Sequence, residues 1–152
     1  MRLRTIETLL RLARQAEDRA RIEARGKRKA LDDSKNLSQA LLIYSEEYAG
    51  NFAKLGLGGG STAQELHLQN AFRKKLDQTR TEQAGVIEAN RTGYEGAVEF
   101  VSQNRMRTRI FEGFEARERE RIRRLAERTE QAMLDDLVNS RRIDDSAGTD
   151  DA

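Results

Sequence analysis

The chain has 152 residues, of which 36% are charged, 37% hydrophobic and only 5% aromatic. A compact domain of this length would bury a core with more large apolar residues, so we expect a fold with much surface, such as a long helix pair. Because the sequence has no cysteine, disulfides and thiolate metal sites are excluded. The formal net charge is only +2 and acidic residues interleave with the arginines, so we expect no nucleic-acid partner.

The pattern along the chain predicts helix and no strand. Proline is absent, good helix formers are abundant, and no stretch alternates apolar and polar residues with strand period. No apolar run approaches the roughly 20 residues that span a bilayer, and charges interrupt the N-terminal segment too often for a signal peptide. We therefore expect a cytoplasmic protein.

A glycine-rich segment at 56–61 interrupts the helical pattern. Glycine permits the left-handed backbone at which helices end. Ser61 and Thr62 then offer helix N-caps, with Gln64 and Glu65 at the spacing of a capping box. The segment is therefore predicted to be a turn between two helices.

These signals define one coiled-coil domain over 1–143. We expect helix one at about 2–55, a turn at 56–61 and helix two at about 62–142. Two long helices joined by a short turn lie antiparallel, so the predicted fold class is all-α, an elongated antiparallel two-helix coiled coil or helical hairpin. The last segment, 144–152, is small and acidic and is expected to be disordered.

Steps of three and four residues give a heptad seam along both helices. The seam is apolar at both ends of helix one and thin in its middle. Beyond Phe111 the register of helix two slips, and it resumes at Ile122, Leu125, Thr129 and Met133. The predicted seam positions are, on helix one, Ile6, Leu9, Ala13, Ala16, Ala20, Glu23, Lys27, Ala30, Ser34, Leu37, Leu41, Tyr44, Tyr48 and Leu55, and, on helix two, Phe72, Leu76, Thr79, Gln83, Val86, Asn90, Gly93, Ala97, Phe100, Asn104 and Phe111.

The sequence offers no catalytic, cofactor-binding or metal-binding residues. His67 is the single histidine and has no acidic or thiol partner at ligand spacing. The glycines at 56–60 follow no strand, and no Gly-Lys-Ser/Thr follows them, so they form no phosphate loop. Carboxylate pairs such as Asp32-Asp33 lie among basic residues on exposed helix. We therefore expect neither an enzyme nor a small-molecule substrate.

Two segments resemble one protein family. Residues 41–48 (LLIYSEEY) precede the glycine-containing break, and residues 68–79 (LQNAFRKKLDQT) follow it. A Tyr-x-x-Glu-Tyr helix end, a short loop and a second helix opening with Phe-x-x-x-Leu are features of the flagellar export protein FliJ family. The resemblance covers the central third of the chain.

The resemblance implies a coiled-coil component of the flagellar type III export apparatus, with roles in flagellum biogenesis and motility. Family members act like a rotor stalk inside the ring of the export ATPase FliI, contact the membrane export gate FlhA and assist export chaperones. The expected location is therefore the cytoplasm, with peripheral association to the inner membrane through these partners.

The family's surface for the gate also transfers to this chain. The family can carry other residues at Leu37, Thr79 and Gln83, so the remaining positions transfer more strongly. Since these residues are also seam positions, the pattern leaves open whether they form core or partner surface. The set is Leu37, Leu41, Tyr44 and Tyr48 on helix one and Phe72, Leu76, Thr79 and Gln83 on helix two.

Arginines gather at the opposite end of the predicted hairpin. Such a density of guanidinium groups could engage acidic loops of the ATPase ring. The alternative is a solvated face held by neighbouring glutamates at helical spacing. The arginines concerned are Arg2, Arg4, Arg11 and Arg14 of helix one and Arg117, Arg121 and Arg124 of helix two.

Two other functions fit the same pattern. The equivalent stalk of a virulence type III secretion injectisome would share this architecture. A generic coiled-coil scaffold or homodimer would use the same seam.

Overall fold

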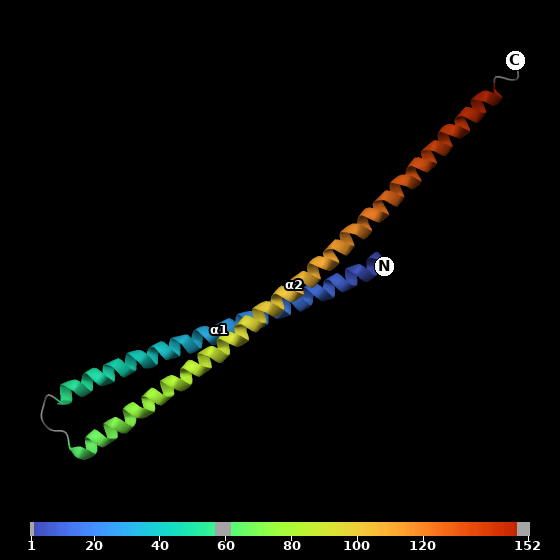
Figure 1. The fold of residues 1–152 in the computed structure, drawn as a ribbon. Coiled ribbons are helices and arrows are strands. Elements are labelled where there is room, and N and C mark those ends of the chain that lie inside the picture. The colour runs from blue at the N-terminus through green and yellow to red at the C-terminus, as the bar shows by residue number, and fades with distance from the viewer. Residues whose placement is uncertain (1, 57–61, 149–152) are drawn as a thin grey trace. The chain divides into compact units, whose positions relative to one another are not determined.

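The computed structural model describes residues 2–56 and 62–148. It contains two helices, α1 (Leu3–Gly56) and α2 (Ala63–Ala147), which are the two coiled ribbons in Figure 1. Helix accounts for 98% of the described residues, and none of them lies in a strand. The all-α fold class is confirmed. Over the same ranges, neither helix has a stretch long and apolar enough to cross a membrane.

The start of α2 is fixed by a capping box. The backbone N–H of Glu65 donates to Thr62 Oγ1 (3.2 Å), and the backbone N–H of Thr62 donates to Glu65 Oε2 (3.2 Å). These bonds occupy amide groups that have no partner inside the helix. Of the two caps expected, Thr62 is therefore the one used, whereas Ser61 and the turn residues 57–60 lie outside the described residues.

The C-terminal end of α2 extends beyond the expected boundary near residue 142. The helix continues to Ala147, so residues 144–147, expected to be disordered, are helical. The Ser146 hydroxyl donates to the Ile143 carbonyl (2.9 Å), and the Gly148 amide donates to the Asp144 carbonyl (3.1 Å). Extending an existing helix costs far less than nucleating one, so a small acidic sequence can continue it. The rest of the predicted tail, 149–152, lies outside the described residues.

The chain divides into two units, each built from both helices. The hairpin unit comprises Ala16–Asn104. The end unit combines Met1–Gln15 with Arg105–Ala152.

In the hairpin unit, contacts between the helices run in opposite directions along the chain. The Asn90 side-chain amide donates to the Ala30 carbonyl (3.4 Å), and the Gln83 amide donates to the Ser34 carbonyl (3.1 Å). The residue number on α2 decreases from 90 to 83 as that on α1 increases from 30 to 34. The two helices are therefore antiparallel in this unit.

The end unit shows the same antiparallel order through ion pairs. Arg119 Nη2 lies 3.0 Å from Glu7 Oε1, and Arg14 Nη2 lies 3.5 Å from Glu112 Oε1. Ile6 and Leu10 of α1 are 3% and 2% exposed, so this short section of α1 buries two large apolar side chains almost completely. Apolar burial therefore holds the end unit, since its ion pairs are exposed and each contributes about 0–1 kcal/mol.

Half of the predicted seam is correct, and the other half is displaced by one residue. Ile6, Ala13, Ala20 and Ser34 are buried on α1, and Leu76 and Asn104 on α2, as expected. The second position of each heptad follows after four residues instead of three. The buried or half-buried residues there are Leu10, Glu17, Ala24, Leu31, Ser38 and Ser45 on α1 and Ile87, Tyr94, Val101 and Thr108 on α2.

The displacement leaves large apolar side chains outside the seam. Leu37 is 52% exposed and Tyr44 is 51% exposed, whereas the neighbouring Ser38 and Ser45 are half-buried. Small seam side chains leave room for groups of the facing helix, as where the Gln83 amide reaches the Ser34 carbonyl. The seam of the hairpin unit therefore contains many small and polar residues between its larger members, such as Leu31 and Leu76. The predicted continuation of the seam at Ile122, Leu125, Thr129 and Met133 is exposed.

Replacing Gly85 and Gly96 by alanine should stabilise the hairpin unit. A Cβ atom added at either position would meet nothing within 4 Å, so alanine adds helix propensity without a clash. We expect a gain of about 1 kcal/mol per site, measured by urea unfolding followed by circular dichroism. Ala89→Gly, at an exposed position of the same helix, is the control and should lower stability by a similar amount. Unchanged stability in the glycine variants would contradict the observed helical, uncrowded surroundings.

Leu10→Ala should destabilise the end unit, whereas Leu12→Ala should not. Leu10 is 2% exposed and Leu12 is 51% exposed, so only the first change leaves a cavity. We expect a loss of about 2–5 kcal/mol for Leu10→Ala and less than about 0.5 kcal/mol for Leu12→Ala. Thermal unfolding of the two variants side by side measures the difference. Equal unfolding temperatures would show that Leu10 does not occupy the seam.

Candidate partner-binding surfaces

The hairpin unit presents a cluster of three aromatic rings, Tyr44, Tyr48 and Phe72, which we call the aromatic surface. The Phe72 ring lies 4.6 Å from the Tyr48 ring and 6.4 Å from the Tyr44 ring between centroids, the latter edge-on. Phe72 is nevertheless 40% exposed and Tyr44 is 51% exposed. The rings thus support one another while keeping faces and edges in solvent, which suits contact with a protein partner.

The eight predicted gate residues divide into two groups. Leu76 lies buried in the seam, and Gln83, Leu41 and Tyr48 occupy half-buried seam positions. The other four are exposed: Leu37, Tyr44, Phe72 and Thr79. The sequence left open whether these residues form core or partner surface. In the structure, some of them are interior and others are exposed.

Three of the eight residues, Leu76, Gln83 and Thr79, make their contacts within the chain itself. Leu76 is only 9% exposed, and the Gln83 amide donates to the Ser34 carbonyl across the seam. Thr79 is exposed, and its hydroxyl donates to the Lys75 carbonyl of its own helix (2.9 Å). These three residues are poorly suited to contact a partner through their side chains.

One exposed residue beside this surface was missed. Leu68 is 66% exposed and precedes Phe72 by one helical turn, so both side chains lie on the same face of α2. The predicted seam of helix two begins at Phe72, but the i, i+4 spacing of Leu68 and Phe72 also indicates this residue.

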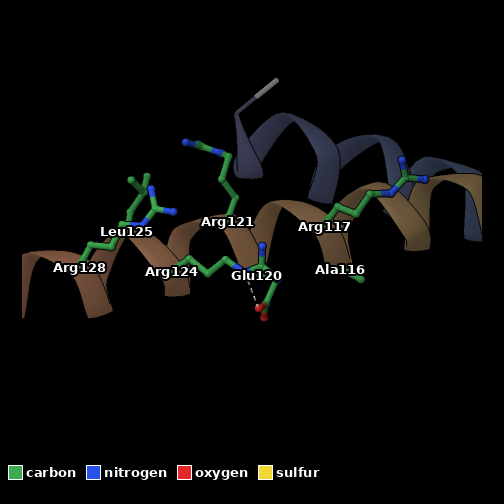
Figure 2. A pocket seen from close by; sticks show the side chains of 7 residues that line it. All are labelled: Ala116, Arg117, Glu120, Arg121, Arg124, Leu125 and Arg128. Atoms are coloured by element: carbon green, nitrogen blue, oxygen red, sulfur yellow. Dashed lines mark hydrogen bonds and ion pairs between the residues drawn. The ribbon is translucent and has the colours of Figure 1, made fainter.

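The end unit carries a surface groove of about 540 Å³ along α2, which we call the arginine groove. Figure 2 shows its side chains on successive turns of the helix, with a dashed line between Arg124 and Glu120. Arginines at i, i+4, i+7 and i+11 necessarily share one helix face. The lining residues are Ala116, Arg117, Glu120, Arg121, Arg124, Leu125 and Arg128.

Glutamates on the same helix orient these arginines. Arg121 Nη2 bonds Glu118 Oε1 at 2.7 Å, and Arg124 Nε bonds Glu120 Oε1 at 3.0 Å. Hydrogen bonds from Arg123 and Arg124 lower the pKa of Glu120 from 4.5 to about 2. The Arg121 hydrogen bond likewise lowers the pKa of Glu118. Both glutamates are therefore ionised at neutral pH, and they partly neutralise the groove.

One groove arginine has a different partner. The Arg117 guanidinium lies 5.4 Å from the centroid of the Phe114 ring, in a cation–π contact. A second, smaller hollow of about 290 Å³ adjoins this pair and is lined by Ile6, Phe114, Arg117, Glu118 and Arg121. The end unit therefore combines positive charge with apolar surface.

The structure separates the predicted basic residues into groups. Arg117, Arg121 and Arg124 line the arginine groove together, as does Arg128, which the prediction omitted although it lies one turn beyond Arg124. The four predicted arginines of the N-terminal segment are exposed and do not line the groove: Arg2, which precedes α1, and Arg4, Arg11 and Arg14 of α1. Among them Arg14 pairs with Glu112.

Across residues 2–56 and 62–148, no group of three or more His, Asp or Glu side chains is arranged to hold a metal ion.

A family model described as flagellar FliJ protein matches residues 1–145, nearly the whole chain. No curated protein and no solved structure matches. The fold defines the chain as a paired-helix protein. It belongs to the flagellar FliJ family, a non-enzymatic component of the flagellar export apparatus. The match extends far beyond residues 41–48 and 68–79, which carry the resemblance in the sequence.

The titration of Glu120 should depend on its two arginine neighbours. Its pKa is lowered in the folded chain, so its ionised form stabilises the helix above the ordinary pKa near 4.5, and this contribution is lost as pH falls towards 2. In an NMR titration, the Glu120 carboxylate should show a midpoint well below 4.5. Combined Arg123→Gln and Arg124→Gln changes should raise that midpoint, whereas Arg128→Gln should leave it unchanged. An unshifted midpoint in the unmodified chain would contradict the pairing.

Proposed function

We propose that this protein binds both the export ATPase FliI and the export gate FlhA, and that it assists the delivery of export chaperones. Its place in the export apparatus follows from its family. The individual partners are assigned from the surfaces described above. Through the gate, the chain would be held peripherally at the cytoplasmic face of the inner membrane.

The exposed Tyr44–Phe72 pair is the observation that carries the proposal. Both rings lie outside the seam and are exposed, and tyrosine combines an apolar ring with a hydroxyl that can bond a partner. Tyrosine is enriched among the few residues that contribute most of the binding energy at protein interfaces. We assign the gate to this surface, with Leu37 and Leu68 at its margin.

The arginine groove supports the assignment of the ATPase ring. Its guanidinium groups are presented in a row, and each can form two parallel hydrogen bonds to a carboxylate. The glutamates between them hold the side chains in place but lie on the same helix, leaving donors on the solvent side. An acidic loop is the complementary partner.

Tyr44→Ala with Phe72→Ala should weaken binding to the cytoplasmic domain of the gate while leaving the ATPase unaffected. Loss of two partly exposed anchors typically lowers interface affinity by about 2 kcal/mol or more, roughly thirtyfold. Purified chain and partners can be compared by isothermal titration calorimetry. Val98→Ala is the control, because Val98 is 45% exposed in the same unit but lies away from the aromatic surface.

Arg121→Glu with Arg124→Glu should produce the reverse pattern. Reversing two groove charges should abolish measurable binding to the ATPase and leave gate binding intact. Arg109→Glu, at an exposed position of the same unit that does not line the groove, is the control. If both sets of variants lose both partners equally while remaining helical, the assignment of one partner to each surface is wrong.

A further inference from the structure

The last part of α2 exposes large apolar side chains that the rest of the chain does not cover. Every described residue from Arg121 to Gly148 is exposed. Met133, Leu134, Leu137 and Val138 are each between 52% and 62% exposed. Four neighbouring apolar side chains in solvent on one short stretch of helix are typical of a surface that a partner covers.

Three pairs of charges on either side of this apolar group are placed symmetrically with opposite sign. Glu127 and Arg141 are each seven residues from Leu134. Arg124 and Asp144 are each ten residues from it. The neighbouring pair, Arg123 and Asp145, lies one residue further out and follows the same rule.

The central part of this pattern lies on one side of the helix. Glu127, Leu134 and Arg141 are seven residues apart, which is close to two turns. At 3.6 residues per turn, Asp135 and Asp136 point about 100° and 200° away from Leu134, so these like charges do not lie at the centre. The face also differs from the one that α1 covers, since it occupies other heptad positions than the buried Asn104 and Thr108.

We propose that two copies of this chain associate through antiparallel pairing of their α2 segments 123–145, centred on Leu134. Leu134 then meets Leu134 of the second copy. Glu127 lies opposite Arg141, because both lie close to the direction of Leu134. Because the arrangement has twofold symmetry, this charge pair occurs twice.

The charges favour the antiparallel direction over the parallel one. In a parallel pair in register, each side chain would face its own copy, so glutamate would oppose glutamate and arginine would oppose arginine. Like charges across a helix interface disfavour that arrangement. A second copy is therefore a better match for this surface than an unrelated acidic or basic helix, which would fit only half of it.

The ion pairs inside α2 are compatible with this association. Arg123 bonds Glu120 and lies 3.4 Å from Glu127, and Arg124 bonds Glu120. Arg123, Arg124 and Glu127 are exposed, and an arginine has five N–H donors, so Arg123 can keep its neighbours while bonding a carboxylate across the interface. Since Arg124 also lines the arginine groove, self-association and binding of an acidic partner there would compete.

Charge exchange in the full-length chain provides the test. We expect sedimentation velocity to show a concentration-dependent dimer that weakens as salt is raised. Glu127→Arg alone should place arginine opposite Arg141, and Arg141→Glu alone should place glutamate opposite Glu127. Each single change should raise the dimer dissociation constant at least tenfold. The double variant, Glu127→Arg with Arg141→Glu, restores opposite charges and should return it to within about threefold of the original.

Matched variants distinguish this surface from others. Leu134→Ser should weaken the dimer, whereas Met106→Ser should not, because the two residues are 61% and 62% exposed but only Leu134 lies on the proposed face. A chain that stays monomeric at millimolar concentration would overturn the proposal. So would a dimer that ignores the single charge reversals, since another surface would then hold it.

Cysteine cross-linking tests the direction of pairing, because the chain has no native cysteine. Under mild oxidation, Leu134→Cys should form a disulfide-linked dimer, whereas Glu127→Cys should not, since residue 127 lies opposite residue 141 in the antiparallel pair. Equal cross-linking of both variants would indicate parallel pairing and overturn the proposal.

Discussion

The size of the side chains at the helix seam is the constraint on which the other features depend. In the hairpin unit the seam is occupied mainly by serine, alanine and polar residues such as Ser34, Ser38 and Gln83. Such a seam buries little apolar area, so it contributes less to stability than a leucine seam would. Polar groups in a helix seam favour one register where they are hydrogen-bonded, as the Gln83 amide is to the Ser34 carbonyl.

Because small residues occupy several seam positions of the hairpin unit, some large apolar side chains lie outside the seam and are exposed to solvent. Leu37, Tyr44 and Phe72 lie beside the seam and are 52%, 51% and 40% exposed. The end unit shows the opposite balance, since Ile6 and Leu10 are almost fully buried and positive charge gathers nearby on α2. One pair of helices thus presents two surfaces of different chemistry, one aromatic and one rich in arginine.

The sequence was sufficient to predict the helices, the capping box and one of the two seam positions in each heptad. The second position could not be predicted because apolar residues stand side by side, as at Leu9 and Leu10, and a period near 3.5 residues allows either. At Tyr44 and Ser45 the pattern favoured the wrong residue, since hydrophobicity alone cannot reveal that the seam requires a small side chain. The resemblance indicated the residues of the aromatic surface. Which of them are exposed depends on the second seam position of each heptad, which the sequence did not determine. Leu68 lies one turn before Phe72, where the predicted seam of helix two begins, and Arg128 lies one turn beyond Arg124, the last arginine of the predicted set.

The series of arginine–glutamate pairs between Glu118 and Glu127 has a consequence for the entropy of binding. These pairs join residues three or four apart, so they strengthen a stretch of α2 that is largely exposed. An unsupported helix of this kind would otherwise unravel readily in water. A partner that docks here encounters backbone that is already ordered, so little conformational freedom is lost on association. The acidic residues, which reduce the net positive charge of the surface, thus preorganise it for recognition.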